Sequence, residues 1–368
     1  MTTRPRHEGD GRKTSVKTRS VFFFVVAIPV IAGLVMGWRH LTGLKPTAFA
    51  DYPNGPGSSE SSSRETSPNI RSTPIPLTNT EVSDRVARGI VESMRMQVEY
   101  LDVLGEGEQG WDSDPTYHKT RTNCILWLES VIADVYGKTD ADKIQVMNRL
   151  RYYGGHIGFG MRKHFIDHWM TLESAPFKQH VPAACRSRVQ KHEVTINPAL
   201  FKESVGYDCP LYREAERSFS LDYLPPDEFV SCARNFEPGY YVIVAVASDA
   251  YLKRYGQTSG PMGYVHSLFL EVAPQGELIM HHASILSGTV KRDDFPDYIR
   301  RTATFYNGFM AYRLDPAWDW RANPGVPEPF RAEAEKVLAC ERDLVNSGVR
   351  RDPAKDFKKN ESPAVSRP

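Results

Sequence analysis

The chain has 368 residues, a formal net charge of +1 and 40% hydrophobic residues. This length allows one large domain or two small ones. A charge balance this close to neutrality excludes the strongly basic surface that nucleic-acid-binding proteins usually carry, so we expect no nucleic-acid partner.

The N-terminal segment predicts export of the chain. Residues 1–20 carry six Lys or Arg against two acidic residues, and residues 21–38 form an uncharged, mostly apolar run. A membrane-spanning helix needs roughly 17–25 such residues, and the basic flank would remain on the cytoplasmic side. The alternative is a cleaved signal peptide, because Ala48-Phe49-Ala50 offers a small-x-small cleavage site. We therefore expect a periplasmic domain, either anchored in the inner membrane or secreted.

A linker and a first helix follow the apolar run. Residues 51–76 are dominated by Ser, Pro, Gly and Asn, a composition typical of a disordered linker. Thr78 and Glu81 have the spacing of a capping box, and an apolar stripe with helical spacing begins directly after them. We therefore expect a helix over about residues 80–103.

Two further helices are predicted before residue 152. One opens at Cys124, and its apolar residues recur at positions 125, 128, 132 and 135. Its predicted C-terminal end is Gly137, because glycine commonly terminates a helix. The other helix begins at Asp140 and continues through Leu150.

The second half of the chain has the pattern of strands. Apolar runs of strand length occupy residues 240–247, 264–272, 278–282 and 309–314, and turn signals separate them. Helices first and strands later indicate an α+β fold, in which helices pack on an antiparallel sheet. We expect this domain to span residues 77–320, followed by a C-terminal helix at 329–345 and a disordered tail at 346–368.

Five cysteines, at positions 124, 185, 209, 232 and 340, form no C-x-x-C pair and no zinc-ribbon spacing. Their odd number leaves at least one thiol outside any disulfide scheme, and Cys124 is the candidate. Cys185 and Cys209 could pair across a short loop or could remain reduced, and the sequence does not decide between these states.

Cys124 taken alone is more often a small buried hydrophobe than a nucleophile. Its position changes that expectation. Thr122 or Asn123 can cap the helix, which leaves the sulfur in the first turn, where N–H groups and the helix dipole stabilise a thiolate. The same N–H groups would stabilise the oxyanion that forms when a thiolate attacks a carbonyl.

Three histidines lie in or beside the predicted strands. His266 lies within one apolar run, and His281 and His282 close the next one. A lone histidine in such a run is usually a core residue satisfied by one hydrogen bond, whereas the functional alternative makes His266 the base for Cys124. Adjacent strand residues point to opposite faces, so only one of His281 and His282 can face His266 and orient it.

Short motifs in one order along residues 80–315 resemble those of a family of cell-wall hydrolases. Besides the Cys124 helix and the histidine strands, these motifs are Leu150-Arg151-Tyr152, Arg162-Lys163-His164-Phe165 with Trp169, Pro238-Gly239-Tyr240-Tyr241, and Gly308-Phe309-Met310-Ala311-Tyr312-Arg313-Leu314. The chain resembles the N-acetylmuramoyl-L-alanine amidase-like family, formerly a domain of unknown function, of the NlpC-type papain-like cysteine hydrolases.

The resemblance implies a papain-like, NlpC-type fold with N-terminal helices packed on an antiparallel sheet or open barrel. It implies that Cys124 is the nucleophile, His266 the base and His282, rather than His281, the orienting residue. It also implies a substrate-binding wall that contains Arg151, Tyr152, Arg162, His164 and Trp169.

Several positions depart from the family pattern around the predicted site. The family usually has Asp before the cysteine, a Thr pair after it, Asp-Ile at the strand entry and His-x-Gly at the base. Here these positions read Asn123, Ile125-Leu126, Tyr240-Tyr241 and His266-Ser267-Leu268. Because the changes line the site, they bear on the identity of the substrate and, to a lesser degree, on activity.

The residue types leave alternatives open for two motifs. Arg151 and Arg162 suit a carboxylate ligand, such as the acidic residue of a stem peptide, or ordinary charge pairing within the protein. His164 and His168 have the i, i+4 spacing of two metal ligands on one helix, but Phe165 stands where a zinc-protease helix needs Glu. We therefore expect no metal and no cofactor.

Together, the residues and the resemblance predict an exported cysteine amidase that cleaves an amide bond in peptidoglycan or muropeptides. The expected partners are this substrate and, through residues 21–38, the membrane. One alternative is an endopeptidase of the stem peptide. Others are a catalytically silent cell-wall-binding domain of the same fold and a membrane-tethered structural module in which Cys124 is a core residue.

Overall fold

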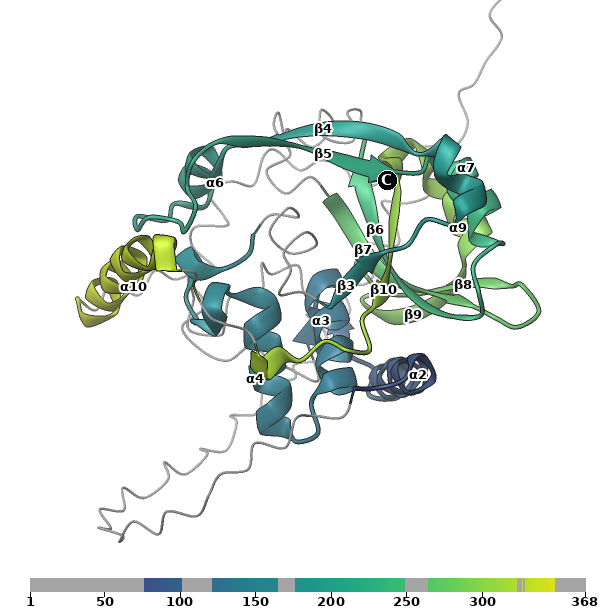
Figure 1. The fold of residues 1–368 in the computed structure, drawn as a ribbon, viewed down its shortest axis with the longest axis horizontal. Coiled ribbons are helices and arrows are strands. Elements are labelled where there is room, and N and C mark those ends of the chain that lie inside the picture. Colours follow the sequence, from purple (N-terminus) through teal and green to yellow (C-terminus); the bar gives the residue numbers. More distant parts are fainter. Residues whose placement is uncertain are drawn as a thin grey trace, which may run out of the picture. The chain divides into compact units, whose positions relative to one another are not determined.

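An eight-stranded sheet, in the order β2-β1-β9-β8-β7-β6-β10-β3, forms the centre of the fold (Figure 1). The computed structural model describes residues 76–100, 121–164, 176–248, 264–322, 326 and 328–347. The predicted membrane or signal segment at 21–38, most of the linker at 51–76 and the tail beyond 347 lie outside these residues. Within the described ranges, no helix has both the length and the apolar character needed to cross a bilayer.

Most neighbouring strands of the sheet are antiparallel, and among the described strands only β1 and β2 are paired in parallel. A separate antiparallel pair consists of β4 and β5. The strands are β1 (Glu99–Tyr100), β2 (Arg121–Thr122), β3 (Phe177–Gln179), β4 (Gln190–Ile196), β5 (Arg217–Tyr223), β6 (Gly239–Ala247), β7 (Tyr264–Val272), β8 (Leu278–Ser284), β9 (Thr289–Asp294) and β10 (Tyr306–Leu314).

Helices precede the long strands and are also interspersed among them. They are α2 (Asn79–Arg95), α3 (Cys124–Tyr136), α4 (Asp140–Arg151), α6 (Pro198–Val205), α7 (Pro226–Ala233), α9 (Phe295–Thr302) and α10 (Arg331–Asn346). This mixture of helices with a largely antiparallel sheet confirms the predicted α+β class.

Two hydrophobic cores lie on opposite faces of the sheet. Phe269 of β7 belongs to the core that α2 and α3 cover, and its neighbours Leu268 and Leu270 belong to the core that α7 and α9 cover. This alternation follows from the strand period of two. It also explains the continuous apolar runs in the sequence, because a strand covered on both faces needs apolar residues at every position.

The first helix begins where the sequence predicts and ends earlier. Thr78 and Glu81 form both hydrogen bonds of the capping box, which confirms the predicted start. The helix ends at Arg95 rather than near residue 103 because Gln97 adopts φ 51°, a left-handed conformation that interrupts a helix. Glu99 then pairs with Thr289 of β9, so the end of the predicted helix is a short strand.

The next two helices follow the predicted boundaries closely. Asn123, one of the two predicted caps, accepts hydrogen bonds at the start of α3, and α3 ends at Gly137 as predicted. A Cβ atom at Gly137 would lie 2.7 Å from the backbone nitrogen of Lys143, so only glycine fits this close approach. Thr139 caps α4, which begins at the predicted Asp140.

All four predicted strands are present, but the sequence did not predict the others. The strand β9 escaped prediction because Val290 is its one buried residue, so it has no apolar run. The strand pair β4–β5 and the edge strand β3 were not predicted for the same reason, because they too are mostly polar. The predicted C-terminal helix is present as α10, which begins two residues later than predicted, at Arg331.

Two disulfides link segments that are distant in the sequence. Cys185 pairs with Cys232 and Cys209 pairs with Cys340. Both states that the sequence left open for Cys185 and Cys209, a mutual bridge and reduced thiols, are therefore wrong. Cys124 is outside both disulfides, in agreement with the odd number of cysteines.

Candidate active site

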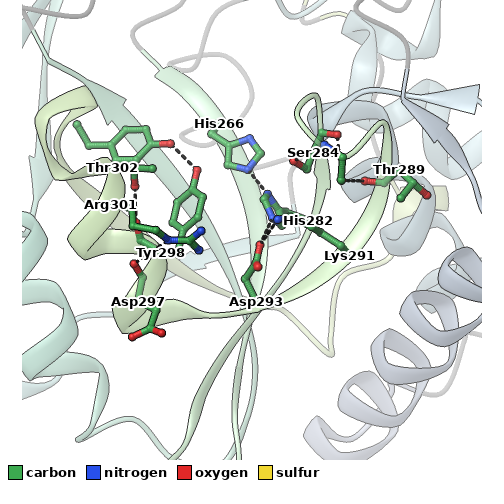
Figure 2. Close-up of polar contacts among 12 residues, drawn as sticks. His266, His282, Ser284, Thr289, Lys291, Asp293, Asp297, Tyr298, Arg301 and Thr302 are labelled. Carbon is green, nitrogen blue, oxygen red and sulfur yellow. Dashed lines mark hydrogen bonds and ion pairs between the residues drawn. The ribbon is translucent and has the colours of Figure 1, made fainter. Parts of the chain in front are cut away.

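Two histidines from neighbouring strands contact each other through their ring nitrogens. Nε2 of His266, on β7, lies 2.8 Å from Nδ1 of His282, on β8 (Figure 2). The two rings meet edge to face, with centroids 5.1 Å apart. The geometry therefore brings together the two histidines that the sequence predicts as base and orienting residue, although their catalytic roles remain a prediction.

A carboxylate extends this pair into a chain of three groups. Nε2 of His282 lies 2.9 Å from Oδ2 of Asp293, on β9 (Figure 2). The ammonium group of Lys291 lies 2.8 Å from the same oxygen. Sequence reasoning missed Asp293 because it missed β9. The sequence does contain one usable signal. Lys291 and Asp293, after the Ser287-Gly288 turn, are two residues apart, so on a strand both side chains lie on one face.

The register of the strands places these groups on one face of the sheet. Met280 pairs with both Leu270 and Asp293, so these three side chains share a face. His282 is two residues from Met280 on β8, and His266 is four residues from Leu270 on β7. Even spacing keeps side chains on one face of a strand, so both histidines lie on the same face as Met280.

His281 points to the opposite face, where its Nε2 lies 2.7 Å from Oε2 of Glu271. The structure therefore answers a question of geometry that the sequence left open. His282, and not His281, is the histidine that meets His266.

Burial keeps both histidines of the chain neutral near pH 7. Burial, together with the neighbouring His282, lowers the pKa of His266 to about 3. Burial also lowers the pKa of His282 to about 4, although the hydrogen bond to Asp293 opposes this shift. Burial alone would raise the pKa of Asp293, but hydrogen bonds from Lys291 and His282 more than offset that effect and lower it. The chain thus consists of two neutral imidazoles and one carboxylate.

Cys124 begins α3 and is partly exposed. The Asn123 side chain accepts hydrogen bonds from the N–H groups of Ile125 and Leu126, at 3.1 and 2.9 Å. These two N–H groups are therefore engaged by the cap and are not among the free N–H groups expected to stabilise a thiolate or an oxyanion. The positive end of the helix dipole remains beside the sulfur, and it favours the thiolate.

Electrostatics connect Cys124 to the histidine chain through Tyr298, on α9. Burial raises the pKa of Tyr298, and the nearby Cys124 raises it further, although the hydrogen bond with Tyr306 opposes the shift. The Tyr298 ring lies 5.5 Å from the ring of His282, and its hydroxyl lies 2.6 Å from that of Tyr306 (Figure 2). Tyr298 is therefore close enough to Cys124 for an electrostatic interaction, and its ring packs against His282.

The helix α3 packs against the sheet on the face that carries Phe269. Trp127, one helical turn after Cys124, makes an edge-to-face contact with Phe269 of β7, with ring centroids 5.6 Å apart. Because residues three apart lie on one side of a helix, Cys124 is on the side of α3 that faces β7. His266 lies on the same strand, three residues before Phe269, so it is on the opposite face of β7 from the one that α3 covers.

The predicted substrate-binding residues lie mainly in the interior. The Arg151 side chain is 1% exposed, and its Nε lies 3.4 Å from Oε2 of Glu129. Tyr152 is buried beside it and forms an isolated β-bridge with the half-buried Arg162. This burial favours the alternative of internal charge pairing for Arg151.

His164 is also buried, and its Nε2 lies 2.8 Å from the carbonyl oxygen of Phe159. Burial lowers its pKa far below the ordinary value, so the ring is neutral. The described part of the chain contains no cluster of three or more His, Cys, Asp or Glu side chains that could hold a metal. Trp169 and His168 lie outside the described residues.

Comparisons with known proteins place this site in a family. The sequence profile named AmiA-like, N-acetylmuramoyl-L-alanine amidase-like, matches residues 99–305. A crystal structure from Legionella pneumophila, of a domain family of unknown function, has a TM-score of 0.51 at 16% identity and covers 67% of this chain and 90% of its own. This likeness shows a shared fold.

An N-acetylmuramoyl-L-alanine amidase from Bacteroides uniformis has a TM-score of 0.49 at 15% identity, with 64% of this chain and 99% of its own covered. No curated protein matches the chain. Since the family profile spans more than half of the residues, this chain belongs to the N-acetylmuramoyl-L-alanine amidase-like family.

Proposed function

We propose that this protein is an exported cysteine amidase that hydrolyses an amide bond in peptidoglycan or in muropeptides. The observation that carries the proposal is the 2.8 Å contact between His266 and His282, which orients the imidazole that we propose as the base for Cys124. A nucleophile, a base and a group that orients the base are the parts that covalent acyl transfer requires. Membership of the amidase-like family supports the choice of substrate.

The proposed reaction proceeds through a thioester. The Cys124 thiol gives its proton to His266, and the sulfur attacks the carbonyl carbon of the amide. His266 then gives that proton to the leaving amine as the C–N bond breaks. Water, deprotonated by His266, attacks the thioester, releases the carboxylic acid and restores the thiol. For an amidase of this class, the acid is the lactyl group of muramic acid and the amine is L-alanine.

The resting state in this proposal is a neutral pair of thiol and imidazole. Burial holds the pKa of His266 at about 3, so a stable imidazolium–thiolate pair is not expected near pH 7. The proton therefore moves when the substrate arrives, which displaces water from the site and brings a carbonyl next to the sulfur. The helix dipole of α3 favours the negative charge that develops on the sulfur.

Two features support export. Four of the five cysteines form disulfides, which persist in oxidising compartments such as the periplasm. The basic segment followed by the apolar run at 21–38 has the pattern of an inner-membrane anchor or a signal peptide. We infer that the domain acts in the periplasm, where peptidoglycan is located, and that it has the papain-like NlpC-type arrangement.

The test is incubation of the full-length protein with purified muropeptides, followed by mass spectrometry of the products. We expect release of a peptide that begins with L-alanine, and no release by Cys124→Ala or His266→Ala. Cleavage within the stem peptide would indicate an endopeptidase instead. Intact substrate after prolonged incubation, with folding verified by circular dichroism, would favour the silent cell-wall-binding domain.

A further inference from the structure

Asp293 sits at the end of the histidine chain, and its role is not contained in the Cys-His-His triad proposed above. Its Oδ2 lies 2.9 Å from Nε2 of His282 and 2.8 Å from Nζ of Lys291. A carboxylate has no proton to donate, so it can only accept hydrogen bonds. His282 must therefore carry its proton on Nε2.

This constraint passes from one ring to the next. A neutral imidazole carries one N–H, so protonation of Nε2 leaves Nδ1 of His282 as an acceptor. The atom 2.8 Å from this Nδ1 is Nε2 of His266, which must then be the donor. The remaining nitrogen of His266, Nδ1, has a lone pair and no proton.

We infer that Asp293 is a positioning residue that acts through His282 to hold His266 in the tautomer whose Nδ1 can accept the Cys124 proton. The inference deepens the proposed function and rests on it for its catalytic consequence. Without an acceptor at position 293, both tautomers of His282 become available. In the wrong one, Nδ1–H of His282 points at His266 and forces the proton of His266 onto Nδ1, where it blocks the thiol.

The surroundings of the chain favour the neutral state that this logic requires. Burial lowers the pKa values of His266 and His282 to about 3 and about 4, so neither ring is doubly protonated near pH 7. Lys291 helps to keep Asp293 ionised, because its ammonium group contacts the same carboxylate oxygen. The Tyr298 ring packs against His282 without contributing a charge near pH 7.

The experiment reads the tautomers directly. Full-length protein labelled with 15N-histidine is studied by long-range 1H–15N correlation at pH 7, and the signals of the 11 histidines are assigned with single His→Asn variants. We expect Nε2–H on both His266 and His282 in the wild type. Asp293→Ala should mix the tautomers of both rings, whereas Asp293→Asn should largely restore them, because its amide oxygen can still accept the hydrogen bond.

Two controls isolate the carboxylate. Lys291→Met removes the cation and keeps the acceptor, so the tautomers should not change. Glu271→Gln alters the other histidine–carboxylate pair, on the opposite face of β8, and should leave His266 and His282 unaffected. A proton on Nδ1 of His266 in the wild type would overturn the inference, as would unchanged tautomers in Asp293→Ala.

Activity gives the second measurement. We expect kcat for muropeptide cleavage to fall about 10- to 100-fold in Asp293→Ala with little change in KM, and Asp293→Asn to recover most of the loss. If the wild type does not cleave muropeptides, the proposed function fails, while the 15N spectra still decide the role of Asp293. If Asp293→Ala does not fold, the wild-type and Asp293→Asn spectra test whether Asp293 sets the tautomers of His282 and His266.

Discussion

Two histidine–carboxylate pairs lie on consecutive residues of one strand, β8, and face opposite sides of the sheet. His282 meets Asp293 at 2.9 Å, and His281 meets Glu271 at 2.7 Å. Both imidazoles are buried, with side chains 3% and 7% exposed, and both carboxylates are partly exposed. The two pairs are therefore nearly identical in chemistry and in burial.

They differ in what the second ring nitrogen meets. Nδ1 of His282 meets His266, whereas Nδ1 of His281 is buried and has no hydrogen-bond partner among the residues that the structure describes. A histidine–carboxylate pair therefore does not identify an active site by itself. Its place on a strand face decides whether it meets a second histidine.

Replacement of His266, the proposed base, should have the largest effect on activity. We expect His266→Ala to lower kcat/KM for muropeptide cleavage by about 10³-fold or more, because the thiol loses its base. His281→Ala, on the other face, should change it by less than about 3-fold, within the effect of a modest structural perturbation. Steady-state kinetics on both purified variants makes the measurement. Equal losses in the two variants would contradict the assignment of the active face.

The orienting histidine should have a smaller effect than the base. His282→Asn keeps a polar side chain but removes the ring that holds His266, and we expect a loss of about 10- to 10³-fold in kcat. The matched variant is His281→Asn, which makes the same chemical change one residue earlier. If His281→Asn lowers kcat as much as His282→Asn, the effect is one of strand packing rather than orientation.

Acid should lower the free energy of unfolding of the protein, because His282 is buried as a neutral ring. The folded-state pKa of His282 is about 4, below the ordinary value of 6.5, so the unfolded chain binds more protons between these values. Stability is therefore full above about pH 6.5 and is lost as the pH falls toward 4. We expect urea unfolding to show that His282→Asn reduces the acid-induced loss between pH 7 and pH 5 by about 1–2 kcal/mol. An unchanged loss in this variant would show that His282 is not a buried neutral group.

Replacement of Glu271, on the face of the sheet opposite His282, should have the smallest effect. Glu271→Gln replaces the charged partner of His281 with a neutral one. We expect it to lower the free energy of unfolding by no more than about 1 kcal/mol, because Glu271 is partly exposed and solvent screens the interaction. Muropeptide cleavage should be unchanged. A loss of activity in Glu271→Gln with normal stability would mean that both faces of β8 contribute to catalysis.

Local signals carried most of the successful predictions about the fold. The capping box of Thr78 and Glu81, the cap at Asn123 and the glycine at position 137 act within a few residues, so the starts of two helices and the end of one could be read directly. The apolar runs of β6 and β7 are similarly local, because both faces of these strands are covered. Motif order along the chain predicted the family, which the family profile confirms.

The rest depended on contacts between distant residues. No periodicity marks the mostly polar β9, so Asp293 could not be placed against His282 until the sheet was assembled. The partners of Cys185 and Cys209 were open for the same reason. Burial of Arg151 against Glu129 favours internal charge pairing, one of the two alternatives that the sequence left open for this arginine.

The sequence by itself determined several helices, the four apolar strands and which cysteine stays outside the disulfides, because caps, apolar periodicity and residue counts are local properties of the chain. The tertiary structure alone decided which of His281 and His282 meets His266, and that a carboxylate lies beyond it. A strand alternates its faces with a period of two, so two neighbouring histidines are equivalent in the sequence. Only the register between β7, β8 and β9 distinguishes the pair that joins the candidate active site from the pair that does not.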